Sequence, residues 1–232
     1  MTHPVIHRVT TLDLGFEPWR WPFADDKCAD IEAHFAAKKR EKPIWNGRIL
    51  LGRDPDFTAE RFSARYFDAD FASFLAWRDW GFPDQSIFNG FGMGALRCSD
   101  GAFVLGEMAA HTANAGRVYF PSGTPDLDDI RDDAVDIAGS IAREVQEETG
   151  LSPTEYRACA HWDCVATGTV IAIIKRLDVD VPGEALRARI EANLAGQCQP
   201  ELSAIHLVRE PRDLTTAMPR FVIAFIESEM AK

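Results

Sequence analysis

The stretch of this sequence that decides the fold is Arg143-Glu144-Val145-Gln146-Glu147-Glu148-Thr149-Gly150-Leu151. Apolar or small residues recur through it, and just before it, at the three-and-four spacing of one helix face: Ala138, Ile141, Ala142, Val145 and Thr149. This spacing predicts a helix with one buried face. Asp136 is placed to cap its N-terminus, and Gly150 can adopt the left-handed conformation that ends the last turn.

The glutamates of this stretch lie at positions i, i+3 and i+4 of the predicted helix, so their carboxylates should converge on the face opposite the apolar residues: Glu144, Glu147 and Glu148. Like charges at this spacing repel, at a cost of about 0.2–0.5 kcal/mol per close pair, and Arg143 can offset part of it by pairing with Glu147. A solvated acidic face is one interpretation. A site for hard divalent cations is the other, because Mg²⁺ and similar ions take carboxylate oxygens.

The stretch resembles the second half of the Nudix box, whose pattern is Arg-Glu-aliphatic-any-Glu-Glu-any-Gly-aliphatic, and every fixed position matches. The resemblance implies an α/β fold, a Nudix-like α/β/α sandwich with a mixed β-sheet. It also implies a Mg²⁺- or Mn²⁺-dependent hydrolase of nucleoside diphosphates linked to another group. In that family the three Glu hold the metals and the Arg orients them, which assigns these roles to Glu144, Glu147, Glu148 and Arg143. Glu148 itself, or Glu201 at the start of a strand that resembles a late strand of the family, is the candidate general base.

The first half of the box departs from the family's pattern. Where the family has a Gly fourteen residues before the Arg and a Glu eight before it, this chain has Asp129 and Val135. Gly123, in Tyr119-Phe120-Pro121-Ser122-Gly123-Thr124, supplies the Gly better and makes the following loop longer by six residues. Acidic residues fill that region, namely Asp126, Asp128, Asp129, Asp132, Asp133 and Asp136. Either one of them replaces the missing Glu, or the role is absent and the segment is an acidic, mobile surface loop.

Two other function classes remain open. The altered first half of the box is what a Nudix-fold binding protein or sensor without hydrolytic activity would show. Retention of all three glutamates, whose clustering is unfavourable without metal, favours the enzyme. A protein-interaction domain that uses the aromatic N-terminal part is the third reading, and exposure of Phe71 and Phe74 would support it.

Composition limits the partners. The chain has 232 residues and a formal net charge of −11, which argues against broad affinity for nucleic acid or for an anionic membrane. It does not exclude a small phosphorylated substrate, because bound cations invert the local sign of an acidic pocket. No apolar run of about 18 residues predicts a membrane span, and the N-terminus lacks a signal-peptide pattern, so we expect a cytoplasmic protein. Cys159, His161 and Cys164 lack a second ligand pair and are expected to be thiols of a strand core rather than a zinc site.

We expect an N-terminal extension over residues 1–87, packed on a core domain over residues 88–232. In the extension the pattern predicts a helix from Asp26 to Lys42 that Pro43 stops, a hairpin at Asn46-Gly47, and a helix between Phe57 and Trp80 capped by Asp68 or Asp70. The aromatic residues of the last helix suit core packing, with base stacking or a contact in a possible homodimer as alternatives. If the extension completes the pocket, it favours a diphosphate-linked substrate larger than a bare triphosphate.

In the core domain, Ser99-Asp100-Gly101 predicts the turn of an opening hairpin. Further strands are expected at residues 117–120, 156–162, 169–174 and 201–208, and helices at residues 183–194 and 219–230. His111, in the connection before the strand at 117–120, is a candidate substrate-binding residue beside Gly123; a solvated loop histidine is the alternative.

Overall fold

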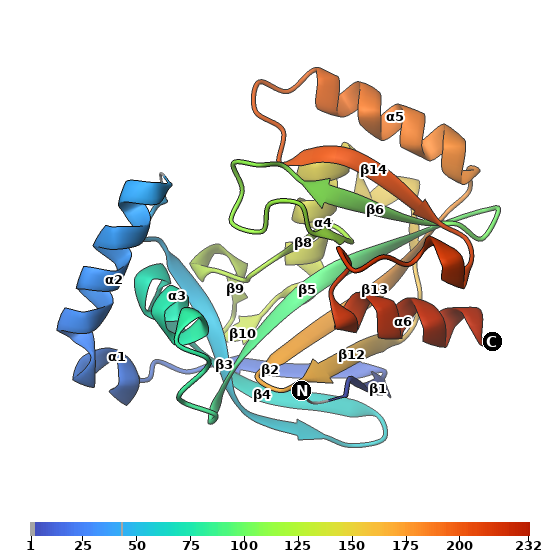
Figure 1. The fold of residues 1–232 in the computed structure, drawn as a ribbon. Helices are drawn as coiled ribbons and strands as arrows, with labels where there is room; N and C mark the ends of the chain where they lie inside the picture. The colour runs from blue at the N-terminus through green and yellow to red at the C-terminus, as the bar shows by residue number, and fades with distance from the viewer. Residues whose placement is uncertain (1–2, 43) are drawn as a thin grey trace.

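A computed structural model describes residues 3–42 and 44–232 and shows a mixed α/β protein (Figure 1). The helices are α1 (Pro22–Asp26), α2 (Cys28–Glu41), α3 (Phe71–Asp79), α4 (Ile137–Thr149), α5 (Gly183–Ala195) and α6 (Arg220–Met230). The longer strands are β1 (Val5–Val9), β2 (Thr11–Phe16), β3 (Arg48–Phe57), β4 (Arg61–Asp70), β5 (Ile87–Cys98), β6 (Phe103–Met108), β12 (Trp162–Thr167), β13 (Val170–Val179) and β14 (Leu202–Val208). The short elements are β7 (Val118–Tyr119), β8 (Ser122–Gly123), β9 (Ile130–Arg131), β10 (Ala134–Val135), β11 (Arg157–Ala158) and the 3-10 turns η1 (Leu127–Asp129), η2 (Pro153–Glu155) and η3 (Pro211–Asp213).

The strands form one mixed sheet in which β5 is the central element. The main path runs β1-β12-β13-β5-β3-β4-β2-β10-β9, and β6 leads from β5 to β14 and β7. β5 pairs in parallel with β13 and antiparallel with β3, β6 and β8. The sheet therefore continues across residue 87, since β3 belongs to the expected N-terminal extension and β13 to the expected core domain.

Two helices cover opposite faces of the sheet at β5, which gives the expected α/β/α sandwich. Successive residues of a strand face opposite sides. A side chain at Gly92 would meet Ile141 of α4 at 2.7 Å, so the helix lies directly against the strand there. Phe91, one residue earlier, packs edge-on against Phe221 of α6 with ring centroids 5.7 Å apart. Figure 1 shows α4 behind the sheet and α6 in front of it.

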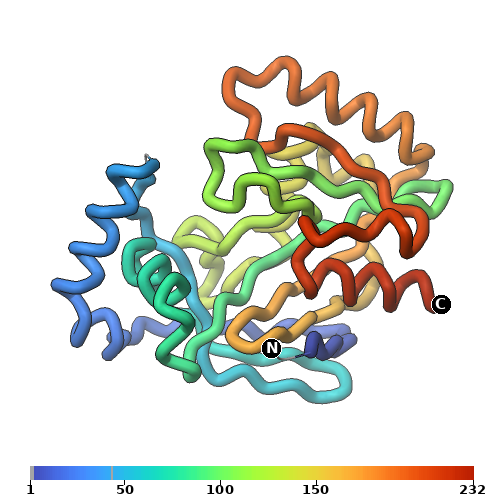
Figure 2. Tube along the Cα trace, viewed as in Figure 1, coloured from blue at the N-terminus to red at the C-terminus, as the bar shows by residue number. Residues whose placement is uncertain are grey.

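The helices of the N-terminal extension gather at one end of the sheet. Figure 2 shows the blue-to-teal segment with α2 and α3 on the side away from α5 and α6. Ile31 of α2 packs on Ala72 and Ala76 of α3. The other face of α3 joins Trp21 and Phe67 in a separate aromatic cluster. The aromatic residues of this region therefore serve mainly as core, as expected.

Two predictions for the extension were wrong. Asn46-Gly47 forms no hairpin turn, because Asn46 Oδ1 instead accepts the backbone N–H of Ala72 at 2.8 Å and Gly47 lies just before β3. The first half of the predicted helix between Phe57 and Trp80 is the strand β4, which is paired on both edges, with β3 and with β2. Those pairings are non-local and override the helical spacing of the phenylalanines. The helix α3 begins only after Asp70, whose side chain caps it by accepting from Ser73 N at 2.9 Å.

Most other elements agree with the predictions. The hairpin of β5 and β6, the strands β7, β13 and β14 and the helices α5 and α6 lie within a few residues of the predicted ranges. The first run predicted at 156–162 is mostly irregular, with β11 ending at Ala158 and β12 beginning at Trp162. α2 ends at Glu41; the predicted stop at Pro43 lies outside the described residues. Among the helices described, none has the length and apolar character needed to cross a bilayer.

Candidate active site

The predicted helix around Arg143–Leu151 is α4, with the predicted ends. Asp136 Oδ1 accepts the backbone N–H of Gly139 at 2.9 Å, and Gly150 ends the helix with φ = 75°. Ile141, Val145 and Thr149 are buried as expected, but Ala138 is exposed. Ile137 is buried in its place, because its larger side chain reaches the sheet beside Gly92.

The three box glutamates occupy different environments. Glu147 is exposed, Glu144 is half-buried, and Glu148 is only 5% exposed. Glu148 therefore does not lie on a solvated face opposite the core: it lies near β8, where the backbone N–H of Ser122 favours the charged carboxylate. A Cβ atom at Gly123 would lie 2.3 Å from Glu144 Oε1, so any side chain there would displace the Glu144 carboxylate. The expected neighbour of the box, Gly123, thus lies directly against Glu144.

Asp129 is the acidic residue of the loop that meets the box arginine. Arg143 Nη2 lies 3.0 Å from both carboxylate oxygens of Asp129 and 3.6 Å from Glu144 Oε1. The backbone N–H of Asp126 also donates to Asp129, at 3.1 Å, which fixes the carboxylate from the other side. The helical spacing had suggested that Arg143 pairs with Glu147. It pairs with Asp129 instead. A buried, charge-assisted contact of this kind orients the guanidinium.

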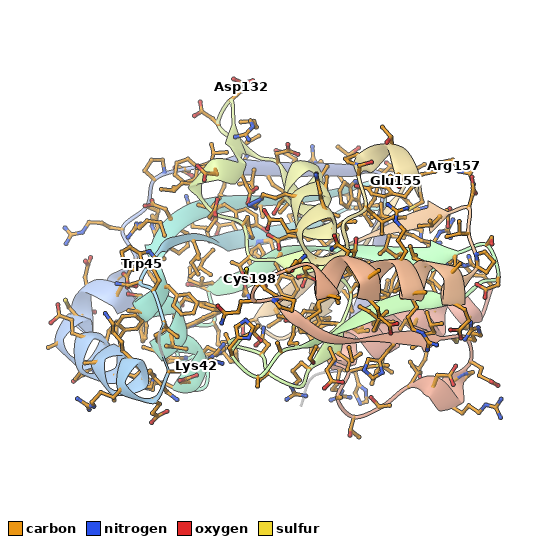
Figure 3. The ribbon with its side chains drawn as sticks, turned by 90° about the horizontal axis from the view of Figure 1, so that it is seen from above. Lys42, Trp45, Asp132, Glu155, Arg157 and Cys198 are labelled. Atoms are coloured by element: carbon orange, nitrogen blue, oxygen red, sulfur yellow. The ribbon has the colours of Figure 1, made fainter. Side chains whose placement is uncertain are left out.

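The remaining residues of the loop do not reach the box arginine. Val135, at the position where the family's pattern has its Glu, is buried in the core. Asp126 caps η1, and Asp136 caps α4. Asp132 is exposed in the turn between β9 and β10 and projects away from the body of the protein (Figure 3). Of the acidic candidates, Asp129 is the one that the fold places in contact with Arg143.

Burial and mutual repulsion make these carboxylates hard to ionise without a cation. Burial raises the pKa of Glu144 to about 7, with Arg143 opposing the shift and Glu147 and Glu201 adding to it. Burial also raises the pKa of Glu148 well above its ordinary value, and Glu144 and Glu201 add to the shift. Among the residues that the structure describes, no Lys, Arg or His pairs with Glu147 or Glu148 within 4.0 Å. A buried carboxylate without a basic partner, whose pKa the neighbouring carboxylates raise further, fits a hard divalent cation.

We therefore expect Mg²⁺ to stabilise the protein more at about pH 8 than at about pH 5. The metal-free folded protein binds protons at Glu144 and Glu148 that the unfolded chain, with an ordinary pKa of 4.5, releases. Their contribution to the free energy of unfolding consequently falls as the pH rises from 4.5 to about 7, and a cation reverses that loss. The melting temperature with saturating Mg²⁺ and with chelator, at both pH values, measures the effect. A stabilisation that is equal at both, or greater in acid, would contradict it.

A second group of possible metal ligands lies elsewhere and is already neutralised. Single ligand atoms of His161, Asp163 and Glu229 lie within 4.8 Å of one another. Arg8 donates to both carboxylates at 2.9 Å, Arg176 donates to Glu229 at 2.9 Å, and Lys232 also pairs with Glu229. Three cations on two carboxylates leave no place for a metal ion. This network joins β1, β12, β13 and α6 instead, so its role is structural.

Replacing Glu229 with Gln should destabilise the fold by about 3 kcal/mol, because it removes the buried anion with which Arg8, Arg176 and Lys232 all pair. Denaturant unfolding monitored by tryptophan fluorescence measures this loss. The matched control is Asp180→Asn, which breaks an ion pair with Arg157 whose side chains are 75% and 85% exposed. That change should stay within about 0.5 kcal/mol of the parent. Equal losses in the two variants would show that the network is not what holds these elements together.

The other predicted site residues lie around the box. Glu201 is exposed, directly before β14, and its charge acts on Glu144, Glu148 and Tyr119. Its backbone carbonyl accepts from Ala109 N at 2.8 Å, which brings the 109–117 connection to the same side. His111 is exposed in that connection, and the neighbouring Asn114 donates to the Tyr119 hydroxyl at 3.2 Å. The roles of Glu201 and His111 stay predictions.

A cavity of about 730 Å³ opens beside the box. Ser122, Gly123 and Thr124 form part of its wall, and Gly123 lies against Glu144, which does not itself line the cavity. Most of the lining comes from α3, β5 and the start of α6, and its residues carry no motif in the sequence. The residues are Phe71, Phe74, Arg78, Phe82, Asn89, Phe91, Met93, Ala113, Asn114, Arg117, Tyr119, Val170, Thr216, Met218, Pro219, Arg220 and Phe221. The sequence signal for this lining was the number of aromatic residues between positions 67 and 75. Core packing accounts for only some of them, since Phe71 and Phe74 line the cavity.

Of the thiols predicted to lie in a strand core, Cys164 does so, whereas Cys159 lies between β11 and β12 and is only partly buried. Cys164 is fully buried in β12, and burial raises the pKa of its thiol to about 12. Cys159 Sγ lies 3.1 Å from the carbonyl oxygen of His161. His161 Nε2 lies 3.4 Å from Asp163 Oδ2, in the ionic network.

Sequence comparison finds no family model and no curated protein that matches this chain. Comparison with solved structures finds similar folds. The solved structures that it resembles include several Nudix hydrolases. One from Nitrosomonas europaea is 18% identical with a TM-score of 0.39, over 62% of this chain and 89% of that one. The MutT protein of Methanosarcina mazei is 18% identical with a TM-score of 0.37, over 62% and 96%.

A third similar structure is a bifunctional NMN adenylyltransferase/ADP ribose pyrophosphatase from Francisella tularensis. It is 13% identical with a TM-score of 0.45, over 68% of this chain and 45% of that one. These likenesses concern the fold; the chemistry of this chain rests on the residues of its own site.

Proposed function

We propose that this protein hydrolyses a phosphoanhydride bond in a nucleoside diphosphate linked to another moiety, such as a nucleotide sugar or ADP-ribose, with Mg²⁺ or Mn²⁺. The observation that carries the proposal is the buried carboxylate of Glu148, which has no basic partner among the described residues. A cavity large enough for a nucleotide is lined by Ser122 and Gly123, and these two residues lie next to Glu148 and Glu144. A solvated acidic face would not bury a carboxylate in this way.

Different residues of the site bind the cations, position Arg143 and accept the proton of the attacking water. Glu144, Glu147 and Glu148 would hold the cations, and Asp129 keeps Arg143 against Glu144. When bound, divalent cations neutralise phosphate oxygens and lower the pKa of coordinated water. Glu148 or Glu201 accepts the proton of the attacking water. The oxygen of that water bonds to one phosphorus, the bridging P–O bond breaks, and the leaving phosphate takes up a proton, which gives two monophosphates.

The test is release of monophosphates from a panel of nucleotide sugars, ADP-ribose, dinucleoside polyphosphates and nucleoside triphosphates. Each is assayed with Mg²⁺, with Mn²⁺ and with chelator. Metal-dependent turnover of a diphosphate-linked class, abolished by chelator, is the expected result. Tight binding of one compound without turnover of any would instead establish the alternative, a binding protein or sensor on the same fold.

A further inference from the structure

The wall of the cavity beside the box is positively charged. Three arginines line it, namely Arg78, Arg117 and Arg220, and none of the lining residues that the structure describes is acidic. In the whole chain acidic residues outnumber Lys and Arg by 36 to 25, so the charge of this wall is opposite to that of the molecule. Among the residues described, no acidic group pairs with Arg117 or Arg220 within 4.0 Å, whereas Arg78 pairs with Asp79 at 3.2 Å. Cations gathered around a cavity without counter-charges repel each other, and a bound anion would remove that repulsion.

Arg78 is the least exposed of the three arginines. Its side chain is 35% exposed, whereas the other two are exposed residues. Its guanidinium lies 5.9 Å from the ring centroid of Phe74, which lines the same cavity, and this contact holds the charge at the cavity wall. Asp79, which pairs with Arg78, also pairs with Lys38 at 3.2 Å. The carboxylate of Asp79 is therefore shared between cations, and Arg78 keeps N–H donors for a ligand.

The register of β5 defines the direction in which the cavity extends. Gly123, which lies against Glu144, pairs with Gly92, so the box lies beside the middle of the strand. Asn89 also lines the cavity and comes three residues earlier, roughly 10 Å away at the usual rise of a strand. The cavity therefore extends along β5 from the box toward the beginning of the strand.

The helix α3 lies at the end of the cavity that is remote from the box. Trp77, directly before Arg78, packs in one hydrophobic cluster with Ile87, the first residue of β5. Phe82, which also lines the cavity, donates its backbone N–H to the carbonyl of Trp77 at 2.8 Å. Figure 1 shows α3 beside the beginning of β5. Arg78 therefore belongs to the far end of the cavity rather than to the box.

Arg220 approaches the same part of the cavity from α6. The next residue, Phe221, packs edge-on against Phe91, with ring centroids 5.7 Å apart. Phe91 lies on β5 between Asn89 and the residue that pairs with Gly123. Arg78 comes from the N-terminal extension and Arg220 from the core domain, so the charge of this end depends on both parts of the chain.

We propose that the far end of this cavity is an anion subsite, which binds a phosphate or carboxylate group that the substrate carries in addition to its scissile diphosphate. The inference rests on the proposed function, because the box and its cations take the diphosphate itself. A guanidinium binds both kinds of oxyanion through parallel N–H···O bonds. The additional group belongs to the nucleoside, as a phosphate on its ribose, or to the other moiety, as in a uronate.

The test compares pairs of compounds that differ by one anionic group. They are ADP-ribose and its 2′-phosphate, dephospho-coenzyme A and coenzyme A, and UDP-glucose and UDP-glucuronate. Calorimetry with chelator measures binding, and kcat/KM with Mg²⁺ is compared wherever a pair is turned over. We expect the more anionic member of at least one pair to be preferred by about tenfold or more.

The pairs also distinguish the source of the anion. The first two place it on the nucleoside, and the third places it on the other moiety. Equal values within every pair, a preference for the less anionic member, or no binding and no turnover of any compound would overturn the inference.

Two variants assign the preference to residues of the cavity. Arg78→Gln should reduce it to about one and leave the affinity for the less anionic member unchanged, because the lost contact is made only by the additional group. Arg220→Gln changes an exposed residue, keeps the fold, and should lower the same preference. A preference that survives both substitutions would contradict the subsite.

Arg97→Gln is the matched control. Arg97 is also half-buried, and its guanidinium lies 5.8 Å from the ring centroid of Phe103, but it does not line the cavity. It should keep the full preference. If Arg97→Gln lowered the preference as much as Arg78→Gln, the effect would come from the net charge of the protein and not from the cavity.

The two proposals can fail separately. Metal-dependent turnover of the diphosphate panel, with equal values within every pair, leaves the hydrolase standing and removes the anion subsite. A preference that depends on Arg78, with no turnover under any condition, leaves the subsite standing and removes the hydrolase.

Discussion

Glu148→Gln is expected to lower metal-dependent turnover by about 10²–10⁴-fold, because it removes a cation ligand that is also a candidate general base. The amide keeps the size of the side chain and can still accept the backbone N–H of Ser122. The loss should therefore reflect charge rather than shape. Steady-state kinetics on the best substrate of the panel, with Mg²⁺ at saturation, measures it.

The same substitution should raise the stability of the metal-free protein at about pH 8, since it removes a buried carboxylate that no described Lys, Arg or His neutralises. Activity and stability thus move in opposite directions, as they do at sites built for function. The matched control is Glu191→Gln on α5. The Glu191 side chain is 54% exposed, and its contact with Arg187 is a long one, at 3.9 Å. It should change neither quantity. Wild-type turnover in Glu148→Gln would remove Glu148 from the mechanism.

Asp129→Asn is expected to lower turnover by about 10–100-fold, the usual effect of losing a residue that orients a metal ligand. The neutral amide cannot hold Arg143 Nη2 through two anionic oxygens, and Arg143 also lies 3.6 Å from Glu144. Asp129 touches neither cation nor substrate in this account. Its loss should therefore raise the Mg²⁺ concentration needed for half-maximal turnover as well as lower the rate. Kinetics across a Mg²⁺ titration measures both quantities.

Asp128→Asn is the control for this prediction. Asp128 is the adjacent acidic residue in η1, is exposed, and does not contact Arg143. It should leave turnover and its dependence on Mg²⁺ unchanged. If Asp128→Asn and Asp129→Asn behaved alike, the loop would act through its net charge rather than through the contact with Arg143.

The sequence predicted α4 well because its determinants are local. Asp136, Gly150 and the apolar spacing between them lie within one helix, and they fix its ends and its buried side. The same reasoning failed for residues 57–70, where the phenylalanines also have helical spacing. β4 forms there because β2 and β3 pair with its two edges, and no window around β4 contains that information.

The site, like the fold, was predictable where its determinants are local in the sequence and not where they are distant. The glutamates and Gly123 could be assigned from a short motif, but the environment of Glu148 depends on β8 packing against α4. The contact of Asp129 with Arg143 crosses fourteen residues and requires the turn η1, which spacing alone does not specify. The cavity assembles residues as distant as Phe71 and Phe221, so it appears only in the folded chain.

The central claim is that the carboxylates of Glu144, Glu147 and Glu148 form a divalent-cation site. The most direct measurement is a crystal structure of the protein soaked in Mn²⁺, with anomalous scattering recorded at the manganese edge. The account predicts an anomalous peak at coordination distance from carboxylate oxygens of these residues, beside Gly123. Manganese bound instead among His161, Asp163 and Glu229, or no peak near α4, would contradict it.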